Sequence, residues 1–293
     1  ERTSFDEFTS IKNLQGNGLS FLTNTHNSKE NMLSDGTIIC SESVYKKLKN
    51  NNPYIIVNDV YSAVAKVSNI FYRSFNYSEI TKLDEPIINS NCNISKSAVI
   101  ENGAIIGKNV NISPGCFIGY NCIIGDNTVI DCNTVISNSI IAENVYVGRN
   151  SSLGQQGFGF AISKNKNIKI FHSGRVILQA GVYLGSNCTI DRGSFGDTII
   201  GQNTYFDNLC HVAHNVIIGS NCIFAAMTGI AGSTNIGNNV LTGGQVGIAG
   251  HLNIGNNVQI AAQSGVLKDI DNNRSVMGHP AIDKIQYIRK YKK

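Results

Sequence analysis

Several residue types are scarce in this chain, and each shortage narrows the range of folds and functions. The 293 residues include no Trp and only four Pro, and only 15% of them are charged. No apolar run approaches the ~20 residues that a membrane-spanning helix needs, and no signal peptide opens the sequence. We therefore expect a cytoplasmic protein without an integral membrane segment.

The charge balance excludes one class of partner. A net charge of +4 is mild for this length and favours an acidic partner. The basic residues do not gather into a patch interleaved with aromatic residues, which is the pattern typical of nucleic-acid binding. We therefore expect no nucleic-acid partner.

Cysteine is comparatively abundant, with eight residues. There is no CxxC pair, so we expect no metal site built from cysteine. Six of the eight occupy a small inward position of the repeat described next, namely Cys92, Cys116, Cys122, Cys188, Cys210 and Cys222. We interpret them as small buried hydrophobic residues in a reducing compartment rather than as disulfide partners.

Glycine is plentiful, with 29 residues, and it accompanies a repeat with a strict period of six. All but one residue of the following series is large and apolar: Ile200, Phe206, Val212, Ile218, Phe224, Ile230, Ile236, Thr242, Ile248, Ile254, Ile260 and Val266. A helix needs apolar residues every ~3.6 positions and a strand every two, so this period fits neither. It predicts a parallel β-helix in which each hexad forms one short strand and a corner, with glycine supplying permissive corner dihedrals.

An earlier block, from Ile94 to Ile136, has the same period. The repeat breaks over residues 155–174, which we expect to leave the column as an excursion loop. Such loops commonly carry function, although an inert insertion is the alternative. At three hexads per coil, the repeats predict about nine coils.

Residues 1–88 lack the period and predict a small α/β domain. Short strands are expected at 18–24, 36–40 and 53–58, and helices at 41–49 and 59–73. The β-helix is expected over 89–270 and a short basic helix over 271–293. The basic tail would suit an acidic partner, although a solvated tail is the alternative.

His214 and His251 are the strongest candidates for chemistry. Both lie outside the inward register and should face outward, on one side of the prism, two coils and about 10 Å apart. A solvated histidine is usually inert, but Gly232 and the pair Gly243 and Gly244 would let a ligand approach the backbone nearby.

These residue types point to acyl transfer. Neutral histidine is a natural general base for an amine or hydroxyl that attacks a thioester, because the ordinary histidine pKa lies near neutral pH. A backbone N–H in a glycine segment could stabilise the oxyanion. No Ser-His-Asp spacing or activated cysteine indicates a covalent intermediate, so direct transfer in a ternary complex is the simpler mechanism.

Six motifs follow one another in a fixed order: GFGFA (157–161), TIDRG (189–193), FDN (206–208), VAHNVIIG (212–219), GIAGST (229–234) and GGQVGIAGH (243–251). In this order they resemble the UDP-3-O-(3-hydroxyacyl)glucosamine N-acyltransferases of lipid A biosynthesis, over nearly the whole chain. The hexad repeat alone would not separate this family from sugar acetyltransferases.

The resemblance implies a left-handed β-helix and a homotrimer with active sites in grooves between subunits. It implies transfer of an (R)-3-hydroxyacyl chain from acyl carrier protein to the 2-amino group of UDP-3-O-(3-hydroxyacyl)glucosamine. The donor is carried on the phosphopantetheine of acyl carrier protein, so no tightly bound cofactor is expected.

The resemblance also assigns roles to residues. His214 is expected to be the general base, supported by Asp207, which lies on a neighbouring side of the prism and would reach it only around a corner or from another subunit. The Gly232 amide is the expected oxyanion donor. His251 is expected at the phosphopantetheine end of the cleft, and Asn208 among the substrate-binding residues.

The front domain resembles the family's uridine-binding pocket. The resemblance implies that Phe21 stacks on the uracil ring and that Asn24 recognises the edge of the uracil base. The family usually continues with Pro-Lys-Tyr, but residues 25–27 read THN, so the second aromatic contact is missing. Gly265 stands where relatives have a larger residue that limits the acyl groove. We therefore expect a 3-hydroxyacyl chain longer than about 14 carbons.

Three alternatives stay open. The first is a nucleotide-sugar N-acetyltransferase that uses acetyl-CoA. The second is a zinc hydratase on the same scaffold, with His211, His214 and His251 as ligands. The spacing of His211 and His214 is unfavourable for this site, because their side chains would not converge on one metal from the same face. The third is a non-catalytic solenoid used for binding or assembly.

Overall fold

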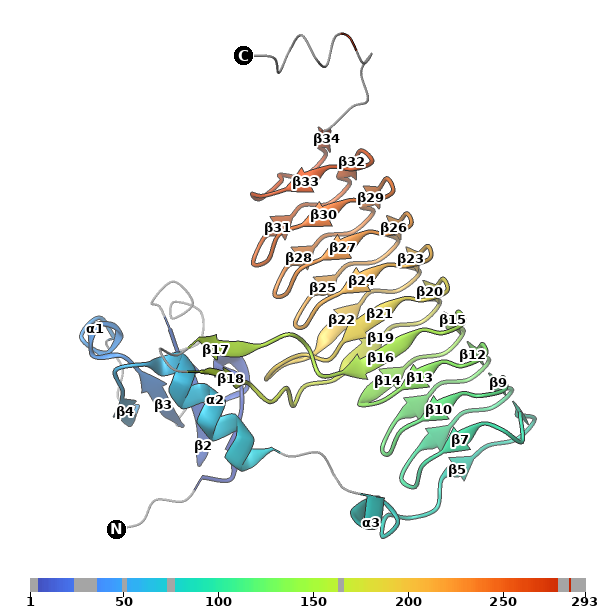
Figure 1. The fold of residues 1–293 in the computed structure, drawn as a ribbon, viewed down its shortest axis with the longest axis horizontal. Helices are drawn as coiled ribbons and strands as arrows, with labels where there is room; N and C mark the ends of the chain where they lie inside the picture. Colours follow the sequence, from blue (N-terminus) through green and yellow to red (C-terminus); the bar gives the residue numbers. More distant parts are fainter. Residues whose placement is uncertain are drawn as a thin grey trace.

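The computed structural model describes residues 5–23, 36–48, 52–72, 77–162, 166–278 and Ile285. Most of this chain forms one long parallel β-helix, and a smaller domain stands beside its middle coils (Figure 1). The fold class expected from the sequence, a left-handed parallel β-helix of hexapeptide repeats, is confirmed. None of the helices in the described ranges is long and apolar enough to cross a bilayer.

Each coil contributes one strand to each of three parallel sheets, which we number 1 to 3. Sheet 1 contains β7 (Val99–Ile100), β10 (Phe117–Ile118), β13 (Val135–Ile136), β16 (Ser152–Gln155), β21 (Thr189–Asp191), β24 (His211–Val212), β27 (Gly229–Ile230), β30 (Gly247–Ile248) and β33 (Gly265–Val266). Sheet 2 contains β5 (Ile87–Ile88), β8 (Ile105–Ile106), β11 (Ile123–Ile124), β14 (Ser139–Ile141), β19 (Val176–Leu178), β22 (Thr198–Ile200), β25 (Ile217–Ile218), β28 (Asn235–Ile236) and β31 (Asn253–Ile254). Sheet 3 contains β6 (Asn93–Ile94), β9 (Asn111–Ile112), β12 (Val129–Ile130), β15 (Tyr146–Val147), β20 (Tyr183–Leu184), β23 (Tyr205–Phe206), β26 (Ile223–Phe224), β29 (Leu241–Thr242), β32 (Gln259–Ile260) and β34 (Ser275–Val276).

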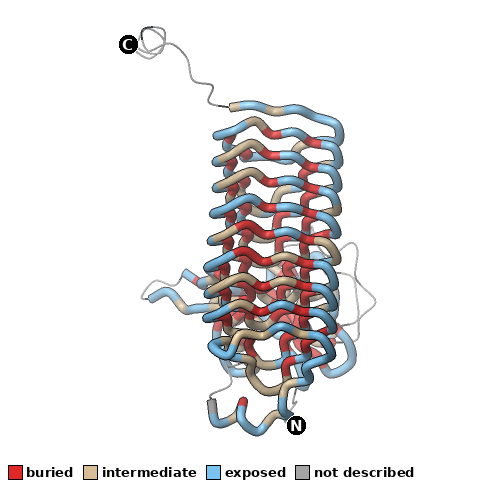
Figure 2. Tube along the Cα trace, turned by 90° about the vertical axis from the view of Figure 1, so that its right-hand side faces the viewer, coloured by how far each residue is buried: buried red, intermediate tan, exposed pale blue. Residues whose placement is uncertain are grey.

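The two-residue strands explain the period of six. In each such strand the first side chain points outward and the second points into the column, where Val212, Phe224 and Ile230 are almost fully buried. Buried residues therefore run in lines along the inside of the prism (Figure 2). Thr242, the exception in the apolar series, is also buried, and its hydroxyl pairs with that of Thr228 at 3.0 Å.

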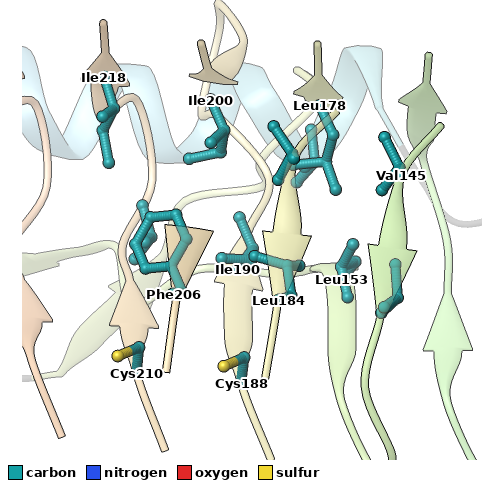
Figure 3. Packing of buried hydrophobic residues seen from close by; sticks show 14 of the residues in the cluster. Val145, Leu153, Leu178, Leu184, Cys188, Ile190, Ile200, Phe206, Cys210 and Ile218 are labelled. Atoms are coloured by element: carbon teal, nitrogen blue, oxygen red, sulfur yellow. The ribbon is translucent and has the colours of Figure 1, made fainter. Parts of the chain in front are cut away.

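The cysteines lie where the sequence predicted. Cys188 and Cys210 occupy neighbouring coils beside Ile190 and Phe206 in the core (Figure 3). All eight thiols are free, and burial raises the pKa of Cys122 to about 11. Burial also raises the pKa of Cys116 and Cys222, so these thiols stay protonated and act as small apolar side chains.

The corners differ from the expectation that glycine supplies their dihedrals. Most positive φ angles in the column belong to asparagine, including Asn221 at 59°, Asn239 at 57° and Asn257 at 56°. Asparagine tolerates this left-handed region, and here its side chains also bond along the axis, with Asn239 Nδ2 donating to Asn257 Oδ1 at 3.0 Å. Four column glycines do have a positive φ, at residues 103, 115, 154 and 181. Others serve close packing, since a Cβ at Gly219 would lie 2.7 Å from the carbonyl carbon of Gly237 in the next coil.

The small domain is a parallel sheet covered by helices. Its sheet contains β1 (Glu7–Phe8), β2 (Gly18–Leu22), β3 (Thr37–Cys40) and β4 (Tyr54–Ile56). Its helices are η1 (Ile11–Asn13), α1 (Glu42–Tyr45) and α2 (Val60–Phe71), and α3 (Tyr77–Ile80) leads to the first coil. The expected strands and helices are thus present, with Ser41 capping α1 and Asp59 capping α2.

The column is longer at both ends than the expected range of 89–270. It begins at β5, which pairs with β8, and it continues to β34, which pairs with β32. Short strands at each end extend the backbone ladder beyond the hexads that the apolar pattern marks. The expected helix over 271–293 falls largely on residues 279–284 and 286–293, which lie outside the described residues.

The excursion at 155–174 is an ordered link between the two domains rather than a free loop. It contains the antiparallel hairpin of β17 (Phe160–Ile162) and β18 (Asn167–Lys169), which reaches α2 (Figure 1). Asn69 Nδ2 donates to the Lys169 carbonyl at 2.8 Å, and the Phe171 N–H donates to Ser68 Oγ at 3.0 Å. A second excursion sends Phe195 into the aromatic core of the small domain, 4.8 Å from Phe8 between ring centroids.

Candidate functional site

His214 lies at the corner that follows β24, between sheets 1 and 2, and is half-buried. The base of the excursion covers one side of it, since its ring meets the His172 ring edge to face at a centroid distance of 5.0 Å. Gly157, also in the excursion, is so close that a Cβ there would lie 3.1 Å from His214 Cβ. The imidazole is therefore held between the column and the excursion.

Hydrogen bonding fixes the tautomer of His214. Its Nδ1 lies 3.0 Å from Asn215 Oδ1, and that same atom accepts the backbone N–H of Ser194 at 2.9 Å. A backbone N–H can only donate, so the Asn215 atom is the carbonyl oxygen, and Asn215 Nδ2 correspondingly donates to the Gly196 carbonyl at 3.1 Å. His214 Nδ1 must therefore carry the proton, which leaves Nε2 with a lone pair.

Gly232, one coil above, packs against the His214 ring around Nε2 and Cε1. A Cβ at Gly232 would lie 2.8 Å from His214 Nε2 and from Cε1, so any larger residue would displace the ring. The Gly232 carbonyl accepts the His251 N–H at 3.0 Å. Among the hydrogen bonds of the described residues the Gly232 N–H donates to no group, so it is available to a ligand.

His172, which the sequence did not single out, is buried to 1% exposure beside His214. Gln156 holds its backbone from both sides, accepting the His172 N–H at 2.8 Å and donating to its carbonyl at 2.9 Å. Burial, together with the neighbouring His214, lowers the pKa of His172 to about 4. His172 is therefore neutral near pH 7, and its Nδ1 is a buried atom without a hydrogen-bond partner.

A second polar group lies on the outward side of sheet 1. His211, on β24, bonds to the Thr189 hydroxyl through Nδ1 at 2.7 Å, while its Nε2 lies 3.9 Å from Asp191 Oδ2. Asp191 is only 7% exposed, and Gln155 Nε2 donates to its other oxygen at 2.7 Å. Burial raises the pKa of Asp191, and the nearby His211 and His214 oppose that shift.

Above His211 the outward side of sheet 1 carries no side chains. His211 pairs with Gly229, Gly229 with Gly247, and Gly247 with Gly265. A Cβ built on any of these three glycines would meet no atom within 4 Å. We call Gly229, Gly247 and Gly265 the glycine lane. It is a smooth track at about 4.8 Å per coil that starts one coil above His211.

The structure brings some of the predicted site residues to His214 and not others. His251 is exposed at the same edge of the prism two coils above, as expected, with a positive φ of 61°. Asp207 and Asn208 lie at the preceding corner, between sheets 3 and 1, where Asn208 Nδ2 donates to Asp207 Oδ1 at 2.6 Å. Within the chain, Asn215 rather than Asp207 bonds to His214.

The residues expected at the uridine pocket are only partly described. Phe21 packs in the aromatic core of the small domain, with its ring centroid 5.9 Å from that of Phe8 and 5.4 Å from that of Phe195. Asn24 and residues 25–27 lie outside the described residues. In the described part of the chain no three His, Cys, Asp or Glu residues are arranged to hold a metal, so His211, His214 and His251 do not form the zinc site considered above.

Three residues of this site were missed by the sequence reading. Asn215 and Asp191 lie inside quoted motifs, next to His214 and before Arg192, but nothing in the spacing says which side chains meet. His172 lies in the excursion, where the period of six gives no register. Only the path of the excursion brings it to His214.

Family models match two parts of the chain. Residues 83–192 match the model of the GMPPB C-terminal domain, and residues 197–232 match the model of the bacterial transferase hexapeptide with six repeats. The second match contains His211, His214 and Gly232.

Curated relatives supply a more specific comparison. A UDP-3-O-acylglucosamine N-acyltransferase of Maricaulis maris is 51% identical over 63 residues, which is 22% of this chain and 18% of the relative. The enzyme of the same name from Caulobacter vibrioides is 52% identical over 64 residues, 22% of this chain and 19% of the relative. The chain contains hexapeptide repeats, and about a fifth of it is similar to these acyltransferases. The aligned part spans about a fifth of the length of these relatives, a narrower match than the motifs suggest.

Solved structures agree with the fold. The UDP-N-acetylglucosamine acyltransferase of Campylobacter jejuni has a TM-score of 0.58 and 25% identity, covering 68% of this chain and 82% of its own. The UDP-N-acetylglucosamine acyltransferase of Bacteroides fragilis has a TM-score of 0.55 and 26% identity, covering 68% and 78% respectively. These proteins share the β-helix of this chain.

The hydrogen bond from His214 to Asn215 predicts a measurable tautomer. Asn215→Gly tolerates the φ of 60° and removes the acceptor, so His214 should change from the Nδ1–H form to a mixture of tautomers, seen in the ring nitrogen shifts by NMR. Asn221→Gly, at a corner with a φ of 59°, is the matched control and should leave the His214 signals in place. An unchanged tautomer in Asn215→Gly would contradict the assignment.

The burial of His172 predicts a loss of stability in acid. Its pKa is about 4 in the fold and about 6.5 in an unfolded chain, so the unfolded state takes up the proton first as the pH falls below 6.5. The stability present above pH 6.5 should decline by about 3 kcal/mol towards pH 4. Denaturant unfolding of the wild type and of His172→Phe at each pH isolates this contribution, because the variant lacks the titrating group. Parallel curves for the two proteins would contradict it.

Proposed function

We propose that this protein transfers a 3-hydroxyacyl chain from acyl carrier protein to the 2-amino group of UDP-3-O-(3-hydroxyacyl)glucosamine, a step of lipid A synthesis. The name shared by the curated relatives supports the reaction class. The observation that carries the proposal is an oriented base close to a side-chain-free track: His214 follows β24, the strand above which the glycine lane stacks.

The chemistry that this pairing supports is a direct transfer. The 2-amino group of the acceptor attacks the thioester carbon while His214 Nε2 accepts one of its protons. The tetrahedral intermediate then collapses, the carbon–sulfur bond breaks, and His214 returns the proton to the phosphopantetheine thiolate. Asn215 holds the imidazole in the tautomer that both steps need.

The oxyanion of the intermediate needs a donor close to the reacting carbon. The Gly232 N–H is available, and its Cα lies against His214 Nε2, so the carbon attacked near that nitrogen also lies near this amide. Removal of one such donor typically slows an acyl transfer about 10²- to 10³-fold. The proposal assigns Gly232 this role.

The glycine lane is assigned to the acyl chain. An extended chain can lie flat on Gly229, Gly247 and Gly265 because no side chain rises from the sheet there. An acetyl group would leave the lane empty, so the lane favours a long-chain transferase over an acetyl-CoA enzyme. Gly265 lies farthest from His214 and leaves the end of the lane open.

The outward surfaces support a second and third copy of the chain. Sheet 3 exposes a ladder of Tyr183, Tyr205 and Ile223, and sheet 2 exposes Ile123 and Ile217. Apolar ladders of this kind on a solenoid suit burial against another copy. A homotrimer would also allow Asp207 of one subunit to support His214 of the next, and His251, Asn208, Phe21 and Asn24 to share the substrate.

Transfer assays test the proposal. Wild type should transfer 3-hydroxyacyl groups from acyl carrier protein to UDP-3-O-acylglucosamine, and His214→Ala should lower kcat by about 10²- to 10⁴-fold, the usual contribution of a general base. Gln259→Ala, an outward residue on β32, is the control and should keep full activity. A folded wild type that transfers no acyl group, or a fully active His214→Ala, would contradict the proposal.

The glycine lane predicts that residues along it set the preferred length of the acyl chain. Met has room at Gly265 and at Gly247, and the two positions are one coil apart, about 4.8 Å or roughly four methylene groups of an extended chain. Gly265→Met should shift the preferred chain to a shorter length, and Gly247→Met should shorten it by about four further carbons. Competition assays with donors of graded length measure this order. Equal length profiles for wild type and both variants would rule the lane out as the acyl site.

A further inference from the structure

A cavity of about 410 Å³ lies where the small domain meets the coils that precede the excursion. This volume is within the usual range for small-molecule sites. Part of its lining comes from sheet 2, where Ile123 of β11 and Ile140 of β14 point outward side by side. Another part comes from Tyr72 and Phe171, whose rings stack at a centroid distance of 6.3 Å. The acyl-transfer mechanism uses none of these residues.

Arg192 supplies the charge of this cavity. It is only 9% exposed, and it forms no ion pair with a carboxylate in the described part of the chain. Its Nε donates to the Gly174 carbonyl at 2.6 Å and its Nη2 to the Ser173 carbonyl at 2.8 Å. A guanidinium has five N–H groups, so three of them, including both on Nη1, meet no acceptor among the described residues. Burial lowers the pKa of Arg192 to about 10, so the group is still positively charged at neutral pH.

The second arginine of the lining is already neutralised. Arg175 Nη2 lies 2.9 Å from Asp197 Oδ2, and Arg175 Nε donates to the other oxygen of that carboxylate at 3.2 Å. The described residues that line the cavity include neither Asp nor Glu. Arg192 is therefore a buried cation without a counter-ion, and such a charge is costly unless an anion binds beside it.

The lining selects the chemistry of that anion. Guanidinium N–H groups bind the oxygens of a carboxylate or a phosphate, often two at a time. The rings of Tyr72 and Phe171 and the side chains of Ile123 and Ile140 offer apolar contact to the rest of the ligand. An organic molecule that carries an oxyanion head on a flat apolar body satisfies both parts of the cavity, whereas an inorganic ion leaves the apolar part uncovered.

We propose that this cavity is a second ligand site, which binds a small organic anion with its carboxylate or phosphate at Arg192 and its apolar body against Tyr72, Phe171 and Ile123. The inference does not rest on the proposed function. Asn138, which lines the cavity, lies at the same corner as His214 but three coils lower, about 14 Å along the axis, and the excursion stands between them.

A ligand in this cavity contacts both the column and the small domain. Tyr72 follows α2 in the small domain, whereas Ile123 and Ile140 belong to sheet 2. Binding should therefore stabilise the attachment of the two domains and raise the thermal midpoint of the full chain.

Three probes with the same ring test the site. We measure the binding of phenyl phosphate, phenylacetate and uncharged 2-phenylethanol to the full chain by calorimetry, together with the thermal midpoint. Wild type should bind at least one of the two anions saturably, and about tenfold or more tightly than 2-phenylethanol, because hydrogen bonds to charged groups are the stronger ones. The preferred anion then tells whether the head is a phosphate or a carboxylate.

A charge placed in the cavity tests the location. Ile123→Glu leaves the bonds of Arg192 to the backbone intact and should weaken binding of the anions about tenfold or more by like-charge repulsion. Ile140→Glu, on the neighbouring strand, should act in the same way. The matched control is Val135→Glu, which makes the same change at an outward position of sheet 1 that is 40% exposed, against 38% for Ile123. It should keep the wild-type affinity.

The outcomes separate cleanly. Saturable anion binding that is weakened in either cavity variant and kept in Val135→Glu supports the site, provided that the thermal midpoints without ligand stay near that of wild type. The proposal is overturned if wild type binds neither anion saturably or binds 2-phenylethanol equally well. It is also overturned if a folded Ile123→Glu or Ile140→Glu binds the anions as wild type does.

Discussion

The backbone hydrogen bonds between successive coils are the constraint on which the rest of this molecule depends. They run in parallel register, with a shift in the ladder of β16 and β21 at Leu153 to Gln155. For example, the Thr189 N–H donates to the Cys210 carbonyl at 3.0 Å and the His211 N–H to the Thr228 carbonyl at 2.9 Å. Because each hexad must return to the same register, outward side chains stack in straight ladders along the axis. A single residue type repeated on one ladder therefore shapes a continuous strip of surface. Three glycines make an open lane on sheet 1, while tyrosine and isoleucine make apolar strips on sheets 2 and 3.

The corners contribute chemistry as well as direction. Asn215 occupies a corner position with a φ of 60°, which asparagine tolerates better than most residues. The same side chain accepts hydrogen bonds from His214 Nδ1 and from the Ser194 N–H. The residue that suits the corner dihedral therefore also fixes the tautomer of the imidazole. The orientation of His214 is thus set by rigid backbone elements, which is what a positioned base needs.

The two excursions attach the small domain to the column at the level of this corner. Asn69 and Ser68 on α2 bind the hairpin, and Phe195 enters the aromatic core of the small domain. The attachment brings His172 into a buried position with an unpartnered Nδ1, an arrangement that lowers stability by itself. The packing of the hairpin offsets that loss, and the benefit is a water-excluding wall on one side of His214.

The sequence by itself determined the column. A period of six leaves only a stacked β-helix, and it also placed His214 and His251 outside the inward register, on one side of the prism and two coils apart. The contacts of the site were decided by the tertiary structure. The hydrogen bond of Asn215 to His214, the pairing of Asp191 with His211, and the position of His172 each depend on corners and excursions. At these places the backbone departs from the repeat. The sequence spacing therefore no longer predicts which side chains are in contact, and the three-dimensional path of the chain determines it.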